Sequence, residues 1–68
     1  MAGLADKFAV TLKSERLRRK LSQETLAAKA RLSVSYISML ERGQRAPPLD
    51  TLESLATALS VPPVSLLT

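Results

Sequence analysis

Between residues 33 and 43, the side chains best placed for chemistry lie opposite Ile37 and Leu40 if the segment is helical. At about 100° per residue, these outward residues are Ser35, Ser38, Met39 and Arg42. Hydroxyl groups donate and accept hydrogen bonds, and a guanidinium binds anions such as phosphate. Small hydroxyl residues also let a helix lie deep in a DNA groove, against base edges. A plain solvent-exposed helix face would have the same composition, so the pattern alone leaves both interpretations open.

Other kinds of chemistry are excluded by composition. The chain contains neither cysteine nor histidine, so disulfides, thiolate nucleophiles, Ser-His-Asp catalysis and zinc sites with His or Cys ligands are impossible. No catalytic constellation can be named. We therefore expect a protein that is not an enzyme and has no metal and no cofactor.

Positive charge is concentrated in one part of the chain. Residues 1–45 hold all ten Lys and Arg and four of the acidic residues, a balance of +6, whereas residues 46–68 hold two acidic residues, a balance of −2. A basic surface of this kind suits a polyanion. A solvated helix face explains the charge about equally well.

The dipeptide Leu-Ser occurs at residues 21–22 and again at residues 32–33. Each serine can cap a helix by accepting a hydrogen bond from a free backbone N–H of the first turn. Each leucine can pack on the fourth helical residue, Leu26 or Ile37, as a hydrophobic staple. Two short helices joined by a tight turn are therefore predicted, which is a helix-turn-helix at residues 22–43.

The rest of the chain is also predicted to be helical. Leu4, Phe8 and Leu12 recur every four residues on one face, and Leu17 and Leu21 are expected to continue this apolar stripe. The predicted helices are Leu4 or Asp6 to Arg19, Gln23–Ala30, Val34–Arg42, Leu49–Leu59 and Val64–Leu67, the last with Pro63 at its first position. The fold class is all-α, with five helices in a single domain at residues 1–68.

Several spaced elements resemble the lambda-repressor/Cro-like helix-turn-helix family, also called the xenobiotic-response-element type. They are Ser-Gln-x-x-Leu-Ala at residues 22–27, Ser-x-x-Tyr-Ile-Ser-x-Leu-Glu-x-Gly at 33–43, a proline loop, and Leu-x-x-Leu-Ala-x-Ala-Leu at 52–59. With Phe8, Leu12 and Arg16, the resemblance covers residues 8–67. It implies a compact five-helix DNA-binding domain.

The resemblance also implies roles for individual residues. Residues expected to contact bases are Val34, Ser35, Ser38 and Met39. Residues expected to contact phosphates are Gln23, Ser33, Tyr36, Arg42, Gln44 and Arg45. Arg16 and Glu41 match positions that form an ion pair between the first and third helices. Partial core packing is an equally weighted alternative for Tyr36, and ordinary helix-start polarity is the alternative for Gln23.

Three features depart from the family pattern. Arg31 stands in the turn where glycine is usual, so either it adopts a positive φ or the turn is reshaped. Lys20 replaces another usual glycine. Pro48 and Pro62 stand where Ser or Thr caps are common, so the last two helices are expected to begin without a side-chain cap.

These observations predict a sequence-specific DNA-binding transcriptional regulator, a repressor or autoregulator, from a prokaryote or phage. It would bind a palindromic operator in double-stranded DNA as a homodimer. The expected dimer surface lies in residues 49–68 and includes Val64, Leu66 and Leu67, although these residues could instead complete the monomer core. An antitoxin or another protein-interaction module is the alternative function.

The expected location is the cytoplasm, in association with the nucleoid. No apolar run approaches the roughly 20 residues that span a bilayer, and no small-molecule ligand is evident.

Overall fold

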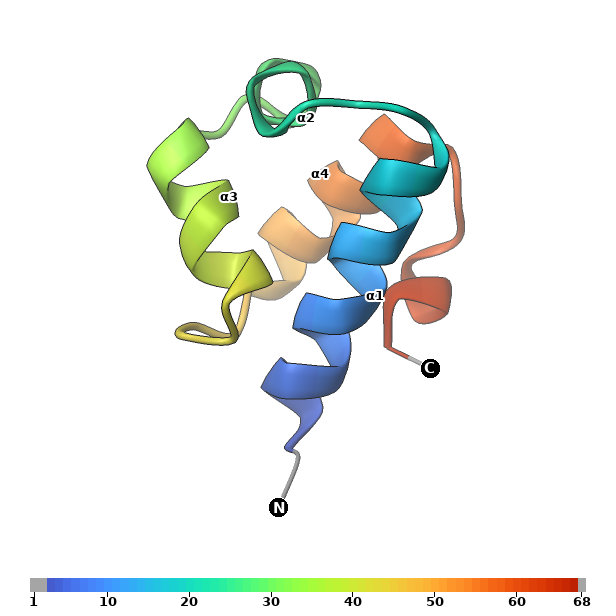
Figure 1. Cartoon of the computed structure of the whole chain (residues 1–68). Coiled ribbons are helices and arrows are strands. Elements are labelled where there is room, and N and C mark those ends of the chain that lie inside the picture. Colours follow the sequence, from blue (N-terminus) through green and yellow to red (C-terminus); the bar gives the residue numbers. More distant parts are fainter. Residues whose placement is uncertain (1–2, 68) are drawn as a thin grey trace.

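The structure, a computed structural model, describes residues 3–67 and is all-α over that range, as predicted. Four α-helices are followed by one short 3-10 helix (Figure 1). Their bounds are α1 Leu4–Arg18, α2 Gln23–Ala30, α3 Val34–Glu41, α4 Leu49–Leu59 and η1 Pro63–Leu66.

The fifth helix differs from the prediction. It is a 3-10 helix that begins at Pro63 and ends at Leu66, and not an α-helix over residues 64–67. The backbone N–H of Ser65 donates to the carbonyl of Pro62 at 2.9 Å, and that of Leu67 donates to Val64 at 3.0 Å. These bonds span three residues, the pattern of a 3-10 helix, which is common in segments too short for several α-helical turns.

Both predicted serine caps are present. The Oγ atom of Ser22 accepts a hydrogen bond from the backbone N–H of Thr25 at 3.0 Å. The Oγ atom of Ser33 accepts one from the N–H of Tyr36 at 3.0 Å. Each bond satisfies a backbone donor that the helix itself leaves free, so both helices of the motif begin where the sequence places them.

Each of the four α-helices is followed by a residue in the left-handed region, which ends the helix. The φ angles are 56° at Lys20, 59° at Arg31, 73° at Gly43 and 59° at Ser60. Arg31 therefore adopts the positive φ considered from the sequence, at a cost of about 1 kcal/mol relative to glycine. Glycine has a further use at residue 43, because an added Cβ would lie 2.7 Å from the Asp6 carboxylate.

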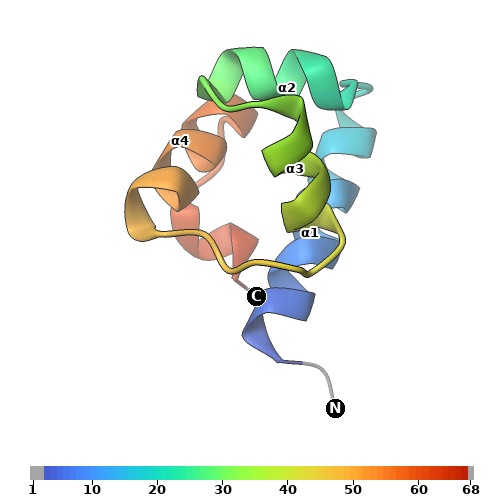
Figure 2. The same cartoon turned by 90° about the vertical axis from the view of Figure 1, so that its left-hand side faces the viewer.

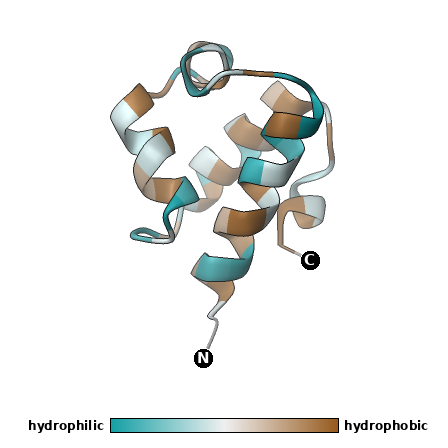
Figure 3. Ribbon diagram, viewed as in Figure 1, coloured by the Kyte–Doolittle hydropathy of each residue, from teal (hydrophilic) through white to brown (hydrophobic). Residues whose placement is uncertain are grey.

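The helices pack in pairs around one core. α1 packs against α3, α2 against α4, and η1 against both α4 and α1. Figure 2 shows α2 running across the top of the molecule with α3 below it. In Figure 3, hydrophobic and hydrophilic residues alternate along the α-helices, as amphipathic helices require.

All five helices contribute to the core. Its buried members are Phe8, Leu12, Leu26, Ala27, Ala30, Ile37, Leu40, Leu52, Leu55, Ala56, Leu59 and Leu66. Leu26, Ala27 and Ala30 line the buried edge of α2, which packs against α4. No helix within residues 3–67 has the length and apolarity needed to cross a bilayer.

Two residues of the predicted α1 stripe are not in the core. Leu17 is 55% exposed and Leu4 is 61% exposed. Leu17 lies nine residues after Phe8, which places it about half a turn away on the opposite face. Arg16 occupies the inward position four residues after Leu12. Leu4 is the first residue of α1 and lies at the edge of the core, and Leu21 packs against the core as predicted.

Candidate nucleic-acid interface

The face of α3 that points away from the core has the predicted composition. Ile37 and Leu40 are fully buried, whereas Ser35 and Arg42 are exposed. Ser38 and Met39 are half-buried, because they lie only about 130° from the buried direction. Val34, at the start of the helix, is 40% exposed. The residues expected to contact bases therefore form one surface along α3.

Arg42 lies along the C-terminal half of this surface. Its Nη1 donates a hydrogen bond to the Oγ atom of Ser38 at 2.7 Å, and its Nη2 donates to the Oε1 atom of Gln44 at 3.3 Å. The guanidinium thus joins the helix to the loop that follows it. The sequence interpretation assigned a contact to each of these residues separately. The spacing of four residues between Ser38 and Arg42 is the signal that could have predicted their contact.

The other residues expected to contact phosphate lie at the ends of the motif helices and in the following loop. Ser33, Gln44 and Arg45 are exposed, and Gln23 is half-buried at the start of α2. Tyr36 is half-buried and packs against the core. The core-packing alternative for Tyr36 is therefore observed, and its phosphate contact stays a prediction.

The ion pair expected between Arg16 and Glu41 is present. Arg16 Nε donates to Glu41 Oε2 at 2.6 Å, and Arg16 Nη2 donates to Oε1 at 2.9 Å. The two side chains are only 9% and 3% exposed. Hydrogen bonding to Glu41 raises the pKa of Arg16 above its ordinary value, so the guanidinium stays charged throughout the neutral range.

This ion pair connects three parts of the motif. Arg16 Nη1 also donates to the carbonyl oxygen of Leu21 at 2.8 Å, just before α2 begins. On the other side, Gln23 Nε2 donates to Glu41 Oε1 at 3.1 Å. α1, the start of α2 and the end of α3 are thus held together by one carboxylate and one guanidinium. The contact between Gln23 and Glu41 was not predicted, because no local spacing relates these residues.

The residues expected at a dimer surface lie away from α3, at the C-terminal end of the described chain (Figure 1). Val64 is 62% exposed and Leu67 is half-buried. Leu66 is fully buried in the monomer core, so its expected place on a dimer surface is corrected. Leu66 lies on the inner side of η1, which packs against both α4 and α1.

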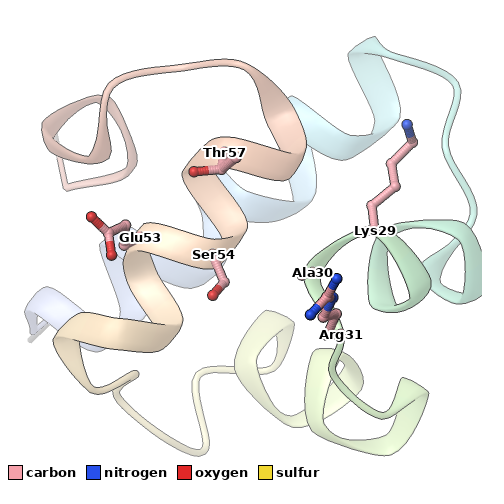
Figure 4. A pocket seen from close by; sticks show the side chains of 6 residues that line it. All are labelled: Lys29, Ala30, Arg31, Glu53, Ser54 and Thr57. Carbon is pink, nitrogen blue, oxygen red and sulfur yellow. The ribbon is translucent and has the colours of Figure 1, made fainter.

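A hollow lies between α2 and α4 and was not predicted from the sequence. Figure 4 shows its lining residues, which are Lys29, Ala30, Arg31, Glu53, Ser54 and Thr57. Lys29 and Glu53 point in different directions and away from each other (Figure 4). The charged groups of this hollow therefore do not converge on a common ligand position.

Comparison with known proteins identifies the family. A family model described as helix-turn-helix matches residues 12–66. The chain belongs to the Cro/C1-type helix-turn-helix family. The match includes the whole motif, α4 and η1, so family membership does not rest on a short segment.

Relatives and solved structures within this family are similar over most of the chain. The immunity repressor of Bacillus phage phi105 is 48% identical over 50 residues, which is 74% of this chain and 35% of that repressor. The chain thus spans about a third of the phage protein. The restriction-modification controller protein C.AhdI of Aeromonas hydrophila is 44% identical, with a TM-score of 0.89 over 91% of this chain and 94% of that one.

A third member of the family was solved with its DNA. The structure of C.Esp1396I bound to a 25 base pair operator site is 33% identical, with a TM-score of 0.86 over 97% of this chain and 87% of that one. These similarities confirm the lambda-repressor-like fold implied by the sequence, with the 3-10 turn in place of a fifth α-helix.

Proposed function

We propose that this chain is a sequence-specific DNA-binding transcriptional regulator, a repressor or autoregulator, and not an enzyme. The observation that carries the proposal is the outward face of α3, where small polar side chains border an exposed arginine. Such a helix can enter the major groove without steric hindrance and present hydrogen-bonding groups to base edges. Family membership and the operator-bound relative support the same conclusion.

Within this proposal, Val34, Ser35, Ser38 and Met39 contact bases. The serine hydroxyls hydrogen-bond to base edges, and the apolar side chains of Val34 and Met39 pack on thymine methyl groups. Arg42 holds the Ser38 hydroxyl in the free protein, and its guanidinium becomes available to a phosphate when DNA approaches.

The phosphate contacts flank this helix on both sides. Gln23, at the start of α2, contacts Glu41 at the end of α3, whereas Ser33 and Tyr36 lie at the start of α3. Arg42, Gln44 and Arg45 lie at the other end of α3 and in the loop after it. The +6 balance of residues 1–45 favours the approach of this side of the molecule to a polyanion.

We further propose that the protein binds a palindromic operator as a homodimer through residues 49–68. Leu49 is 81% exposed and Leu4 is 61% exposed, and both line an apolar groove that also includes Leu67 and Pro47. The groove and the exposed Val64 suit a second copy of the chain. Two protomers with extents of 31 × 23 × 22 Å are of a size that can place their α3 helices about 34 Å apart, one turn of DNA.

A regulator of this kind would act in the cytoplasm, in association with the nucleoid. Its action can be tested with the emission of Tyr36, the only tyrosine in a chain without tryptophan. Titration with duplex DNA should change this emission at low salt, and the affinity should fall steeply as salt is added. No change in emission, together with no gel shift at low salt, would exclude the proposed function.

A further inference from the structure

The side-chain amide of Gln23 is held by a buried carboxylate. Its Nε2 donates to Glu41 Oε1 at 3.1 Å. The same oxygen accepts a hydrogen bond from Arg16 Nη2 at 2.9 Å. The Glu41 side chain is 3% exposed, so it cannot contact DNA directly. Gln23 is half-buried, and part of its side chain reaches solvent at the start of α2.

The charge of Glu41 determines which end of the amide faces inward. A carboxylate only accepts hydrogen bonds, whereas an amide carries a donor end and an acceptor end. Rotation of the Gln23 amide by half a turn would place its Oε1 against Glu41 Oε1, oxygen against oxygen. The carboxylate therefore holds the Nε2 end in place. The second hydrogen of Nε2 remains for another partner.

We infer that Glu41 is a positioning residue for DNA binding, because it fixes Gln23 as a hydrogen-bond donor towards a backbone phosphate. This inference rests on the proposed function. A phosphate oxygen accepts hydrogen bonds and repels an amide oxygen. An amide that is already held with Nε2 as the donor therefore does not have to adopt this orientation when it binds phosphate. The ion pair thus has a second role besides joining the helices.

Gln23 is a neutral donor, which gives the contact a distinct signature. Its loss should weaken binding without changing the salt dependence, because only charged groups that neutralise phosphates release counterions. A hydrogen bond to a charged group typically changes affinity by about tenfold or more. Loss of a cation such as Arg45 would instead lower both the affinity and the salt slope.

NMR can observe the amide in the unmodified protein. The chain contains two glutamines, Gln23 and Gln44, and no asparagine, so only two side-chain carboxamide NH₂ groups are present. In the free protein, one Gln23 proton should be shifted by its bond to Glu41. Addition of a random-sequence duplex should then shift the other proton and leave the first in place. Gln23 protons with the shifts of a solvent-exposed side-chain amide, or an unperturbed second proton in the complex, would overturn the inference.

A mutant cycle tests the same point through affinity. The double variant Arg16→Met/Glu41→Met removes one charge of each sign and leaves no buried ion unpaired. It should bind a random-sequence duplex more weakly than the unmodified protein, with an unchanged salt slope. Gln23→Ala alone should weaken binding about tenfold, and adding Gln23→Ala to the double variant should have a smaller effect.

The outcomes separate the possible failures. Equal effects of Gln23→Ala with and without the ion pair would show that Glu41 has only a structural role. If the double variant does not fold by circular dichroism, the NMR titration of the unmodified protein decides. If the unmodified protein binds no duplex, the proposed function itself fails, and the inference fails with it.

Discussion

Replacement of Glu41 by alanine should strongly destabilise the protein, because it would leave the Arg16 guanidinium buried without its partner. The Arg16 side chain is 9% exposed and loses two hydrogen bonds to the carboxylate. Breaking a buried pair by removing one partner costs about 3–5 kcal/mol. A chain of 68 residues has a total free energy of unfolding of about 3–10 kcal/mol, so a large part of it should be lost.

The destabilisation can be measured by thermal and urea unfolding followed by circular dichroism. At about 4 °C or more per kcal/mol for a domain of this size, the melting temperature should fall by at least about 12 °C. Glu15→Ala is a matched control on α1, since Glu15 pairs with Arg18 and Arg19 and its side chain is 18% exposed. The control should cost about 1 kcal/mol or less. Equal losses of unfolding free energy for the two variants would refute the structural role given to Glu41.

Three further predictions concern DNA affinity, helix termination and assembly. Arg42→Ala should weaken binding to all duplexes similarly and lower the slope of log affinity against log salt by about 0.9 per protomer. Fluorescence anisotropy measures both quantities, and a changed base preference with an unchanged slope would contradict the phosphate contact assigned to Arg42. Arg31→Gly should raise the free energy of unfolding by about 0.5 kcal/mol, because the strain relieved at the positive φ outweighs the conformational entropy that glycine loses on folding. Urea titration measures this free energy, and a lower value for the variant would contradict the prediction. Leu49→Asp should weaken dimerisation by about 1.5 kcal/mol or more per protomer, without lowering the stability of the monomer. Sedimentation equilibrium measures the dimerisation constant, and an unchanged constant would show that the interface lies elsewhere.

Much of the fold follows from local signals in the sequence. The Ser22 and Ser33 caps were predicted because their bonds reach only three residues along the chain. Other predictions were wrong for separate reasons. Leu17 was assigned to the apolar stripe of α1 although it lies half a turn away from Phe8, and the burial of Leu66 depends on the packing of η1 against other helices.

The outward face of α3 was predictable residue by residue, but the side-chain network beside it was not. Helical angles identified the outward face of α3, and the family resemblance supplied the pair Arg16 and Glu41. The contact between Gln23 and Glu41 joins residues 18 positions apart. Such a contact depends on the angle between two helices, which the sequence of neither helix specifies. The bond from Arg42 to Ser38 also depends on side-chain conformation.

The central claim is that α3 recognises a specific DNA sequence as part of a symmetric dimer. Selection of bound duplexes from a random DNA pool tests this claim most directly, because it gives site, symmetry and spacing together. We expect an enriched palindrome whose half-sites have centres about one helical turn apart, and this enrichment should be lost when Ser35 and Met39 are replaced. Recovery of sequences that share no motif, bound with an affinity that depends only on the salt concentration, would contradict the claim.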